Sequence, residues 1–337
     1  MISILSILPL AVSFVVTLLC VPYWIRRARK AELVGRDMHK SDRRTVEEIG
    51  GVPVLVGFLA GAFTYIAITT FYLNIVSVNY KIFAILTTLL LVALIGLIDD
   101  ILGWKIGLRQ WQKPALTLFA ALPLMVVNAG YSEIGLPFLG NVQLSYLYPL
   151  FFIPLGIVGA SNGFNMIGGY NGLEAGMGAL ILSTLGLIAY LSGQGWLAIL
   201  ALCMVAAVVA FLLFNWYPAR IFPGNSFTYF VGALIACVAI MGNMEKLALL
   251  MFIPYLIEFI LKARGFMQKE SFAQLLFDGT LALPYDKWYG IEHISISFLK
   301  SVFSKATEVS VVLLILFFEF IICIIAFLIY YFSIGIF

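Results

Sequence analysis

Residues 195–214, GWLAILALCMVAAVVAFLLF, are twenty consecutive positions without a charged side chain. An α-helix needs about 20 such residues to cross the hydrocarbon core of a bilayer, so this stretch predicts a transmembrane helix. The 337-residue chain as a whole is also strongly apolar, since 63% of the residues are hydrophobic, only 11% are charged and the mean hydropathy is +1.05. This composition excludes a water-soluble globular domain and indicates an integral membrane protein.

Further apolar windows of similar length follow along the chain, and none shows the alternation typical of an outer-membrane barrel. The sequence therefore predicts an all-α fold, a polytopic membrane helical bundle of about ten transmembrane helices that forms a single domain over residues 1–337. Within it, a long cytoplasmic loop at 264–306 precedes the last helix and is expected to act as a lid. The expected spans are 3–24, 52–73, 82–98, 114–128, 146–166, 173–191, 195–214, 227–242, 246–263 and 307–332.

Lys and Arg side chains set the expected orientation, because they resist translocation and collect on the cytoplasmic side. The chain has twenty Lys and Arg residues, and only Lys81 and Lys246 lie in one set of alternate loops. The other eighteen lie in the second set of loops or in the span ends next to them. Both termini are therefore expected outside, with the active site on the cytoplasmic face. That face comprises four polar connections, at 25–51, 99–113, 215–226 and 264–306.

The net charge is only +3, and the basic excess lies beside the membrane. Membrane lipids with anionic headgroups and anionic substrates are therefore the expected partners, and nucleic acid is not. Topology alone is the alternative explanation for many of the basic residues. The sequence leaves the oligomeric state open, with a homodimer as one candidate.

The first polar cluster ends the third expected span, in IGLIDDILGWKIGLRQWQKP at residues 95–114. Asp99 and Asp100 are adjacent there, and neighbouring carboxylates repel each other unless a metal ion, a proton or a cationic group offsets the repulsion. Acids at a helix C-terminus also oppose the helix dipole, so a role as a mere helix end is disfavoured. The pair therefore indicates a functional site, with Lys113 among the basic residues that follow it.

A second cluster, NGFNMIGGYNGLEAG at residues 162–176, joins the fifth and sixth expected spans. Asn162 and Asn165 are three residues apart and share one helix face. The glycines that follow allow positive φ angles, in which successive backbone N–H groups can bind phosphate oxygens, and Asn171 and Glu174 could contact a sugar or a nucleoside. In the alternative interpretation, the asparagines cap helices and the glycines let spans pack closely.

A third cluster, NWYPARIFPGNSFTYFVG at residues 215–232, separates the seventh and eighth expected spans. Its two prolines break the helix and expose backbone, with Asn215, Arg220 and Asn225 at the same membrane face as the other clusters. Phe222 could stack on a nucleobase or belong to the aromatic belt that membrane proteins carry at the interface.

Four motifs occur in order within residues 36–263: EEIGGV at 47–52, LIDD at 97–100, SNGFNMIGGYNGLEAG at 161–176 and NWYPARIFPGNSFTYF at 215–230. In this combination, which is far more specific than any motif alone, the chain resembles the polyprenyl-phosphate N-acetylhexosamine-1-phosphate transferases. Within that family it is most similar to the eukaryotic and archaeal branch, which makes dolichyl-diphosphate-linked GlcNAc.

The resemblance implies an enzyme that transfers GlcNAc-1-phosphate from UDP-GlcNAc to a polyprenyl (dolichyl) phosphate at the cytoplasmic membrane face. The products would be GlcNAc-diphospho-lipid and UMP, in the first step of lipid-linked oligosaccharide synthesis for N-glycosylation. It further implies Mg²⁺ as the cofactor, with Mn²⁺ as an alternative ion, since phosphoryl transfer depends on positioning and charge neutralisation.

The resemblance also implies roles for individual residues at matching positions. Asp99 and Asp100 match the family's acidic pair, which orients or deprotonates the lipid phosphate, and Lys113 matches its phosphate-facing lysine, so these three are the expected catalytic residues. The expected metal ligands are Asn165, Asn225 and Asp100. The expected substrate-binding residues are Lys40, Glu48, Asn162, Asn165, Gly169, Asn171, Glu174 and Phe222.

Four of these residues are implied to hold the nucleotide. Asn171 and the Gly169 backbone match positions that bind uracil and ribose. Phe222 matches the base-stacking aromatic residue and Glu48 a uridine contact, whereas Glu174 is expected to brace the loop.

The chain departs from the family in two places. Asn225 stands where the family usually has an Asp that binds Mg²⁺ directly, and an uncharged amide oxygen should hold the ion more weakly. The lid lacks both the multiple-histidine motif of the bacterial branch and the His-Arg-x-Pro-Arg run of the eukaryotic one, and reads LPYDKWYGIEHI at 283–294 instead. Because this loop usually covers the family's active site, Arg264, Lys287 and His293 are the expected diphosphate contacts.

Two other functions stay open. One keeps the fold and uses another UDP-N-acetylhexosamine as the donor. The other is a lipid or solute transporter, but the spans carry little charge at mid-depth apart from Glu258 and Glu319, and no internal repeat is visible.

Overall fold

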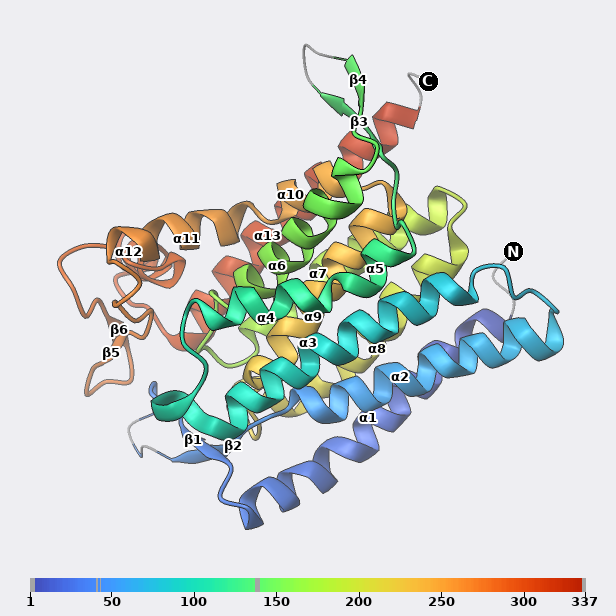
Figure 1. The fold of residues 1–337 in the computed structure, drawn as a ribbon. Coiled ribbons are helices and arrows are strands. Elements are labelled where there is room, and N and C mark those ends of the chain that lie inside the picture. The colour runs from blue at the N-terminus through green and yellow to red at the C-terminus, as the bar shows by residue number, and fades with distance from the viewer. Residues whose placement is uncertain (1–3, 41, 43, 137–139, 335–337) are drawn as a thin grey trace.

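The computed structural model describes residues 4–40, 42, 44–136 and 140–334, and it is a bundle of helices that run side by side (Figure 1). Among the described residues, seven helices are long and apolar enough to cross a membrane. They confirm the prediction of a polytopic helical membrane protein. The seven are Leu5–Lys30, Gly51–Tyr72, Asn79–Gly103, Leu173–Leu191, Gly195–Asn215, Gly224–Gly242 and Glu308–Phe332.

The expected spans 114–128, 146–166 and 246–263 are shorter or interrupted helices in the structure. Pro123 and Pro254 lie in first helical turns, where the missing N–H of proline is tolerated but the preceding helix cannot continue through it. In chain order these helices are α4 (Gln112–Ala120) and α5 (Leu122–Val126), the π-helical turn Tyr148–Phe152 with α6 (Ile153–Phe164), and α10 (Glu245–Met251) with α11 (Ile253–Arg264).

The long helices surround α9 (Gly224–Gly242), in which every residue from Ser226 onwards is buried. Helices α3 (Asn79–Ile106) and α6 pack directly on it. Of the outer helices, α1 (Ile4–Lys30) packs on α2 (Gly51–Ala67) and on α8 (Gly195–Asn215), and the π-helical turn Ile68–Tyr72 continues α2. Helix α7 (Leu173–Leu191) packs on α8 and on α13 (Glu308–Ile334).

Short antiparallel hairpins lie at the two ends of the bundle (Figure 1). At one end are β1 (Val34–Arg36) with β2 (Thr45–Glu47), and the lid, which contains β5 (Gln274–Leu275), β6 (Leu281–Ala282) and α12 (Ile291–Phe303). At the opposite end are β3 (Glu133–Leu136) with β4 (Gly140–Gln143), near the end of α13.

Two glycines let the backbones of α3 and α6 approach α9. A methyl group on Gly96 of α3 would lie 2.6 Å from the Asn225 carbonyl oxygen, and one on Gly232 of α9 would lie 2.4 Å from the Ala160 carbonyl oxygen of α6. Small residues at helix contacts permit this spacing within membranes. The close contact brings the end of α3 and the start of α9 to one level of the bundle.

Gly96→Val should therefore destabilise the protein, because the added side chain meets backbone atoms that cannot move independently. We expect a loss of about 1–3 kcal/mol, as for overpacked cores, measured as a lower Tm of the detergent-solubilised protein. Gly159→Ala is the matched control, since a methyl group there would meet no atom within 4 Å. Equal Tm values for Gly96→Val and the wild type would contradict this account of the packing.

Candidate active site

The Asp100 carboxylate, at the end of α3, accepts two backbone hydrogen bonds from the first turn of α9. Its Oδ1 accepts the N–H of Asn225 at 2.7 Å, and its Oδ2 accepts the N–H of Ser226 at 2.9 Å. The first N–H groups of a helix have no partner within the helix and lie at the positive end of its dipole. Gly224, with φ of 74°, makes room, because a methyl group there would be 2.6 Å from Oδ2 of Asp100.

The Asp99 carboxylate is 4% exposed and joins three segments. Its Oδ1 accepts the backbone N–H of Leu108 at 2.7 Å, in the connection to α4. Its Oδ2 accepts the side-chain amide N–H of Asn225 at 2.9 Å and lies 2.7 Å from the ammonium of Lys113 on α4. The structure therefore brings the acidic pair, Lys113 and Asn225 together, and each acid has its own compensating partners.

The two asparagines at the end of α6 fasten that helix to its neighbours. Asn165 Oδ1 accepts a hydrogen bond at 2.6 Å from the hydroxyl of Thr228, one turn after Asn225 in α9. The amide N–H groups of Asn162 donate to Thr117 Oγ1 on α4 at 3.0 Å and to the Val158 carbonyl at 2.9 Å. Asn165 thus lies beside the first turn of α9, whereas the Asn162 amide donates its hydrogen bonds to other residues of the protein.

Asn171 and Lys40 belong to one buried network. The backbone N–H of Asn171 donates to Glu308 Oε1 at 2.9 Å, and its side-chain amide donates to Asp37 Oδ2 at 3.2 Å. Lys40 forms ion pairs with Glu308 and, at 3.5 Å, with Asp37, and its ammonium lies 4.0 Å from the centre of the Tyr217 ring. In this conformation the network ties the β1–β2 connection and the start of α13 to the loop before α7.

Glu174 braces that same loop, since its Oε1 accepts the N–H of Gly169 at 3.1 Å. Gly169 has φ of 87°, and a methyl group there would lie 2.7 Å from the ring of Phe272 in the lid. The lid therefore covers the glycine loop directly.

His39 fixes the lid to the β1–β2 connection. Its Nε2 accepts the backbone N–H of Ala273 at 3.1 Å, and its ring centre lies 4.3 Å from that of Tyr170. The imidazole is buried, and this burial lowers the pKa of His39 to about 4. The ring is therefore neutral at pH 7, as an acceptor nitrogen requires.

Glu48 and Phe222 lie on two segments that pair through their backbones. The N–H of Phe222 donates to the Glu47 carbonyl at 2.7 Å, and the N–H of Gly50 donates to the Phe222 carbonyl at 2.9 Å. Both the Glu48 and Phe222 side chains are half-buried. Burial, aided by the charge of Asp100, raises the pKa of the Glu48 carboxyl above its usual value.

The three basic residues of the lid that are expected to contact the diphosphate differ in their burial. His293 is fully buried, its Nδ1 accepts the backbone N–H of Tyr289 at 3.1 Å, and burial lowers its pKa. Arg264 and Lys287 are exposed. The hydrogen bond of His293 thus lies within the lid and does not reach the acidic pair.

Sequence reasoning missed the residues of α11 that hold the lid. Glu258 is fully buried, and it accepts the N–H of Ile291 at 2.6 Å and the hydroxyl of Ser271 at 3.0 Å. It also lies 3.3 Å from Lys262, whose ammonium donates to the Met166 carbonyl. The four-residue spacing of Glu258 and Lys262 was the available signal. No sequence signal connects Asp37 with Glu308, because they are 271 positions apart in the chain.

The chemistry of the donor set fits a hard cation. The carboxylates of Asp99 and Asp100 and the amide oxygens of Asn165 and Asn225 are oxygen donors, the ligand type that Mg²⁺ prefers. Among the described residues, no group of three or more His, Cys, Asp or Glu side chains could hold a metal ion alone. Mg²⁺ is commonly held by one or two carboxylates completed by substrate phosphates, and the oxygen donors of these four residues are compatible with that arrangement.

Comparison with known proteins adds an independent finding. Residues 82–243 match the family described as glycosyl transferase family 4. The chain is 38% identical over 290 residues to a protein of Saccharolobus solfataricus named provisionally as a UDP-N-acetylglucosamine–dolichyl-phosphate N-acetylglucosaminephosphotransferase, covering 86% of this chain and 87% of that protein. A protein of Sulfolobus acidocaldarius with the same provisional name is 34% identical over 284 residues, covering 83% and 85%. A phospho-N-acetylmuramoyl-pentapeptide-transferase of Streptococcus pneumoniae is 30% identical over 251 residues, covering 73% and 76%.

The His39 contact predicts that the lid loosens in acid. Because the pKa of His39 in the folded protein is about 4 and its ordinary value is near 6.5, the contribution of the neutral ring is complete above about pH 6.5. It is lost as the pH falls towards 4. Limited proteolysis between residues 264 and 306 should therefore accelerate over that range.

His39→Gln keeps a side-chain acceptor that does not titrate, so its proteolysis should depend much less on pH. This variant separates His39 from His293, whose pKa is also lowered by burial. A wild-type lid whose cleavage rate is the same at pH 7 and pH 4.5 would rule out the His39 contact as a titrating anchor.

Proposed function

This chain belongs to glycosyl transferase family 4, the polyprenyl-phosphate sugar-1-phosphate transferases, and we propose that it transfers GlcNAc-1-phosphate from UDP-GlcNAc to a polyprenyl phosphate of the dolichyl type. The enzyme class follows from the family. The two substrates are part of the proposal and are supported by the names of the archaeal relatives. The product would be GlcNAc-diphospho-lipid, the starting unit of a lipid-linked oligosaccharide for N-glycosylation.

One observation carries the proposal: an acidic pair, a lysine and the first turn of a buried helix meet at one end of a membrane bundle. Lys113 lies 2.7 Å from Asp99, and Asp100 binds the start of α9. For phosphoryl transfer, the protein chiefly has to position the two substrates and neutralise the charge of their phosphates. A fixed cation beside oxygen donors, at the level of lipid headgroups, supplies both.

In the proposed reaction, an oxygen of the lipid phosphate forms a bond with the β-phosphorus of UDP-GlcNAc. The bond between that phosphorus and the bridging oxygen breaks, and UMP leaves with the electron pair. Lys113 offsets negative charge on the phosphates, while Asp99 holds its ammonium in place. Asp99 is itself held by Leu108 and Asn225, so the lysine is oriented before the substrates bind.

The acidic pair orients the acceptor more than it removes a proton from it. The second pKa of a phosphate monoester is near 6, so the lipid phosphate is already largely a dianion at pH 7. A strong base is therefore unnecessary. Mg²⁺, when bound, would neutralise the diphosphate oxygens, with Asp99, Asp100, Asn165 and Asn225 as the donors available in this chain.

We assign the uridine to the paired segments that carry Glu48 and Phe222. A half-buried phenyl ring offers a face for base stacking, and the half-buried Glu48 carboxyl offers hydrogen-bonding oxygens to a base. Gly169 supplies a backbone position close to the lid, and Asn171 positions this loop through Asp37 and Glu308. Arg264 and Lys287 are exposed cations that could reach a diphosphate from the lid.

The proposed orientation has both termini outside and the active site in the cytoplasm. The start of α1 and the end of α13 share one end of the bundle, and the hairpin β1–β2 and the lid share the other (Figure 1). The second end carries the excess of basic residues expected on the cytoplasmic side. A nucleotide sugar made in the cytosol would reach this end directly.

Relatives named phospho-N-acetylmuramoyl-pentapeptide-transferase favour a second candidate donor, a UDP-linked N-acetylmuramoyl peptide. The identity to these proteins, 27–31%, is lower than the 34–38% to the archaeal relatives. UDP-GlcNAc is therefore the first choice.

The function is tested with purified protein in detergent, dolichyl phosphate, Mg²⁺ and UDP-GlcNAc labelled in the sugar. We expect a chloroform-soluble labelled product and UMP in equal amounts. The same assay with UDP-N-acetylmuramoyl pentapeptide should give less product. Absence of lipid-linked label and of UMP release would contradict the proposal.

Asp100→Asn should lower kcat about 10²-fold or more, because it removes a negative charge available to Mg²⁺ and leaves one oxygen to accept the two N–H groups of α9. Binding of UDP-GlcNAc, followed by calorimetry, should change much less. A variant with wild-type kcat would remove Asp100 from the reacting centre.

Asn225→Asp should make the protein more dependent on Mg²⁺. The substitution replaces an amide that donates to Asp99 at 2.9 Å with a carboxylate that repels it, and a divalent cation relieves the repulsion. We expect a lower Tm without Mg²⁺ and a larger rise in Tm on adding Mg²⁺ than in the wild type. Identical Mg²⁺ responses would place residue 225 outside the metal site.

A further inference from the structure

Lys262, in the last turn of α11, joins the lid to the end of α6. Its ammonium donates a hydrogen bond to the backbone carbonyl of Met166 and lies 3.3 Å from Oε1 of Glu258. Only 21% of the Lys262 side chain is exposed, and the Glu258 side chain is fully buried. One cation therefore binds two segments at once, although Met166 and Lys262 are 96 positions apart in the chain.

The Met166 carbonyl lies directly beyond the last turn of α6. That helix ends at Phe164, and Asn165 caps it. Carbonyl groups at a helix C-terminus point out of the helix, and a nearby cation is stabilised at this negative end of the helix dipole. After Met166 the chain enters the glycine-rich loop before α7, at residues 167–172. Lys262 therefore fixes the chain at the place where α6 passes into that loop.

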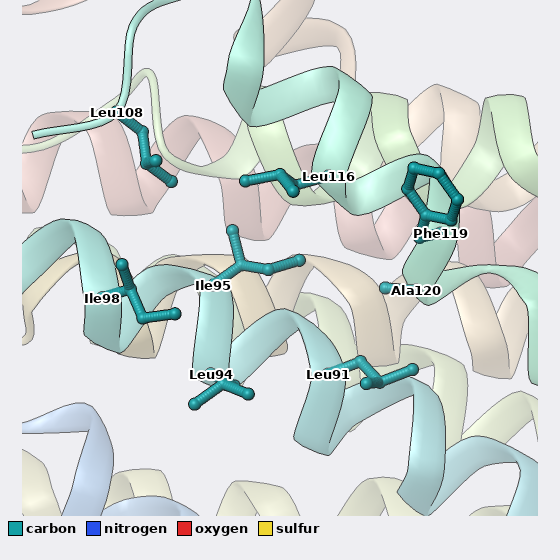
Figure 2. A pocket seen from close by; sticks show the side chains of 8 residues that line it. All are labelled: Leu91, Leu94, Ile95, Ile98, Leu108, Leu116, Phe119 and Ala120. Carbon is teal, nitrogen blue, oxygen red and sulfur yellow. The ribbon is translucent and has the colours of Figure 1, made fainter.

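The Asn165 side chain is held separately, by α9. Its Oδ1 accepts the Thr228 hydroxyl at 2.6 Å, and an amide oxygen has a second lone pair that this bond leaves for a ligand. The eight residues that line the groove between α3 and α4 are all apolar (Figure 2), so their side chains offer no hydrogen bond to α6. Two contacts thus set the place of Asn165: Thr228 binds its side chain, and Lys262 binds the peptide unit that follows.

The lid depends on the same ammonium. Glu258 accepts the N–H of Ile291 at 2.6 Å and the hydroxyl of Ser271 at 3.0 Å, and both donors belong to the lid. The adjacent Glu292 is fully buried, and its carboxyl oxygens accept no hydrogen bond from another described residue. Burial and the charge of Glu258 raise the pKa of the Glu292 carboxyl, whereas the charge of Lys262 lowers it. Loss of Lys262 would leave the buried Glu258 carboxylate without its ion-pair partner, which is strongly destabilising.

We propose that Lys262 is a positioning residue, which places the Asn165 amide oxygen at the Mg²⁺ site while the lid is docked. The inference rests on the proposed function, in which Asn165 is one of the oxygen donors for Mg²⁺, and it adds the link between that donor and the lid. The link runs from the lid through Glu258 to Lys262, and from Lys262 through the Met166 carbonyl to the end of α6. Docking of the lid therefore completes the set of ligands, and undocking loosens it.

Hydrogen exchange of the substrate-free protein tests this link without turnover or metal, so a failure of the link can be told from a failure of the proposed activity. Lys262→Met keeps the apolar stem and removes the ammonium. Backbone amides of residues 166–172 and of the lid should then both exchange about tenfold faster. Lys262→Arg keeps a cation and should protect both segments as the wild type does. Lys305→Met is the matched control, because Lys305 is an exposed lysine of the lid. Wild-type exchange at residues 166–172 in Lys262→Met would overturn the inference.

Glu258→Gln tests the link from the side of the lid and does not depend on the folding of Lys262→Met. It keeps the size of the side chain and removes the charge that pairs with Lys262. Exchange in the lid and at residues 166–172 should rise together. Faster exchange in the lid with unchanged exchange at 166–172 would show that the lid and α6 are held independently, and would refute the link.

A Mg²⁺ titration shows whether Lys262 acts through Asn165. It is followed as the rise in Tm in the presence of UDP, whose diphosphate can complete the site. The Mg²⁺ concentration that gives half of the maximal rise should be about tenfold higher in Lys262→Met, because removal of a group that orients a metal ligand weakens binding of the metal. In an Asn165→Ala background, Lys262→Met should add little, because the ligand that it positions is already absent. An equal tenfold effect in both backgrounds would show that Lys262 acts independently of Asn165, and would overturn the assignment.

Discussion

The site depends on the contact between the Asp100 carboxylate of α3 and the first turn of α9. It joins the end of one membrane helix to the beginning of another through two backbone hydrogen bonds, at 2.7 and 2.9 Å. A helix N-terminus stabilises a carboxylate, so these two hydrogen bonds offset part of the repulsion between Asp100 and Asp99. Asp99 is then free to bind Lys113 and the connection to α4. Lys113 and the acidic pair are thereby held by the start of α9 and by the connection between α3 and α4.

The fold was predictable because the membrane imposes a strict rule. A chain in lipid must satisfy its backbone hydrogen bonds internally, so apolar stretches of sufficient length become helices. The expected stretches are helical, including the interrupted segments with Pro123 and Pro254. What hydropathy could not give is the division of these segments at Pro123 and Pro254, because a hydropathy window does not register the missing backbone N–H of proline. Seven described helices meet the length and composition of a span, against ten expected.

The site was predictable where neighbouring residues carry the signal and not where tertiary contacts do. LIDD lies in the last part of α3 and Gly-Asn-Ser begins α9, and the structure brings Asp99, Asp100, Lys113 and Asn225 together. The partners of Asn171, by contrast, are Asp37 and Glu308, which no local pattern connects to it. The lid depends in the same way on Glu258, whose role appears only when Ile291 and Ser271 fold back onto α11. Roles for the substrate-binding residues remain predictions of the family resemblance.

The central claim is that the β-phosphorus of the nucleotide sugar moves to the lipid at this end of the bundle. The most direct measurement follows two differently labelled donors, UDP-GlcNAc with ³²P in the β-position and UDP-GlcNAc with ³²P in the α-position, incubated with the protein, Mg²⁺ and dolichyl phosphate. We expect the β-label to enter the chloroform-soluble product and the α-label to stay in water as UMP. Sugar in the lipid product with both phosphorus labels left in water would show transfer of the sugar alone and would contradict the account.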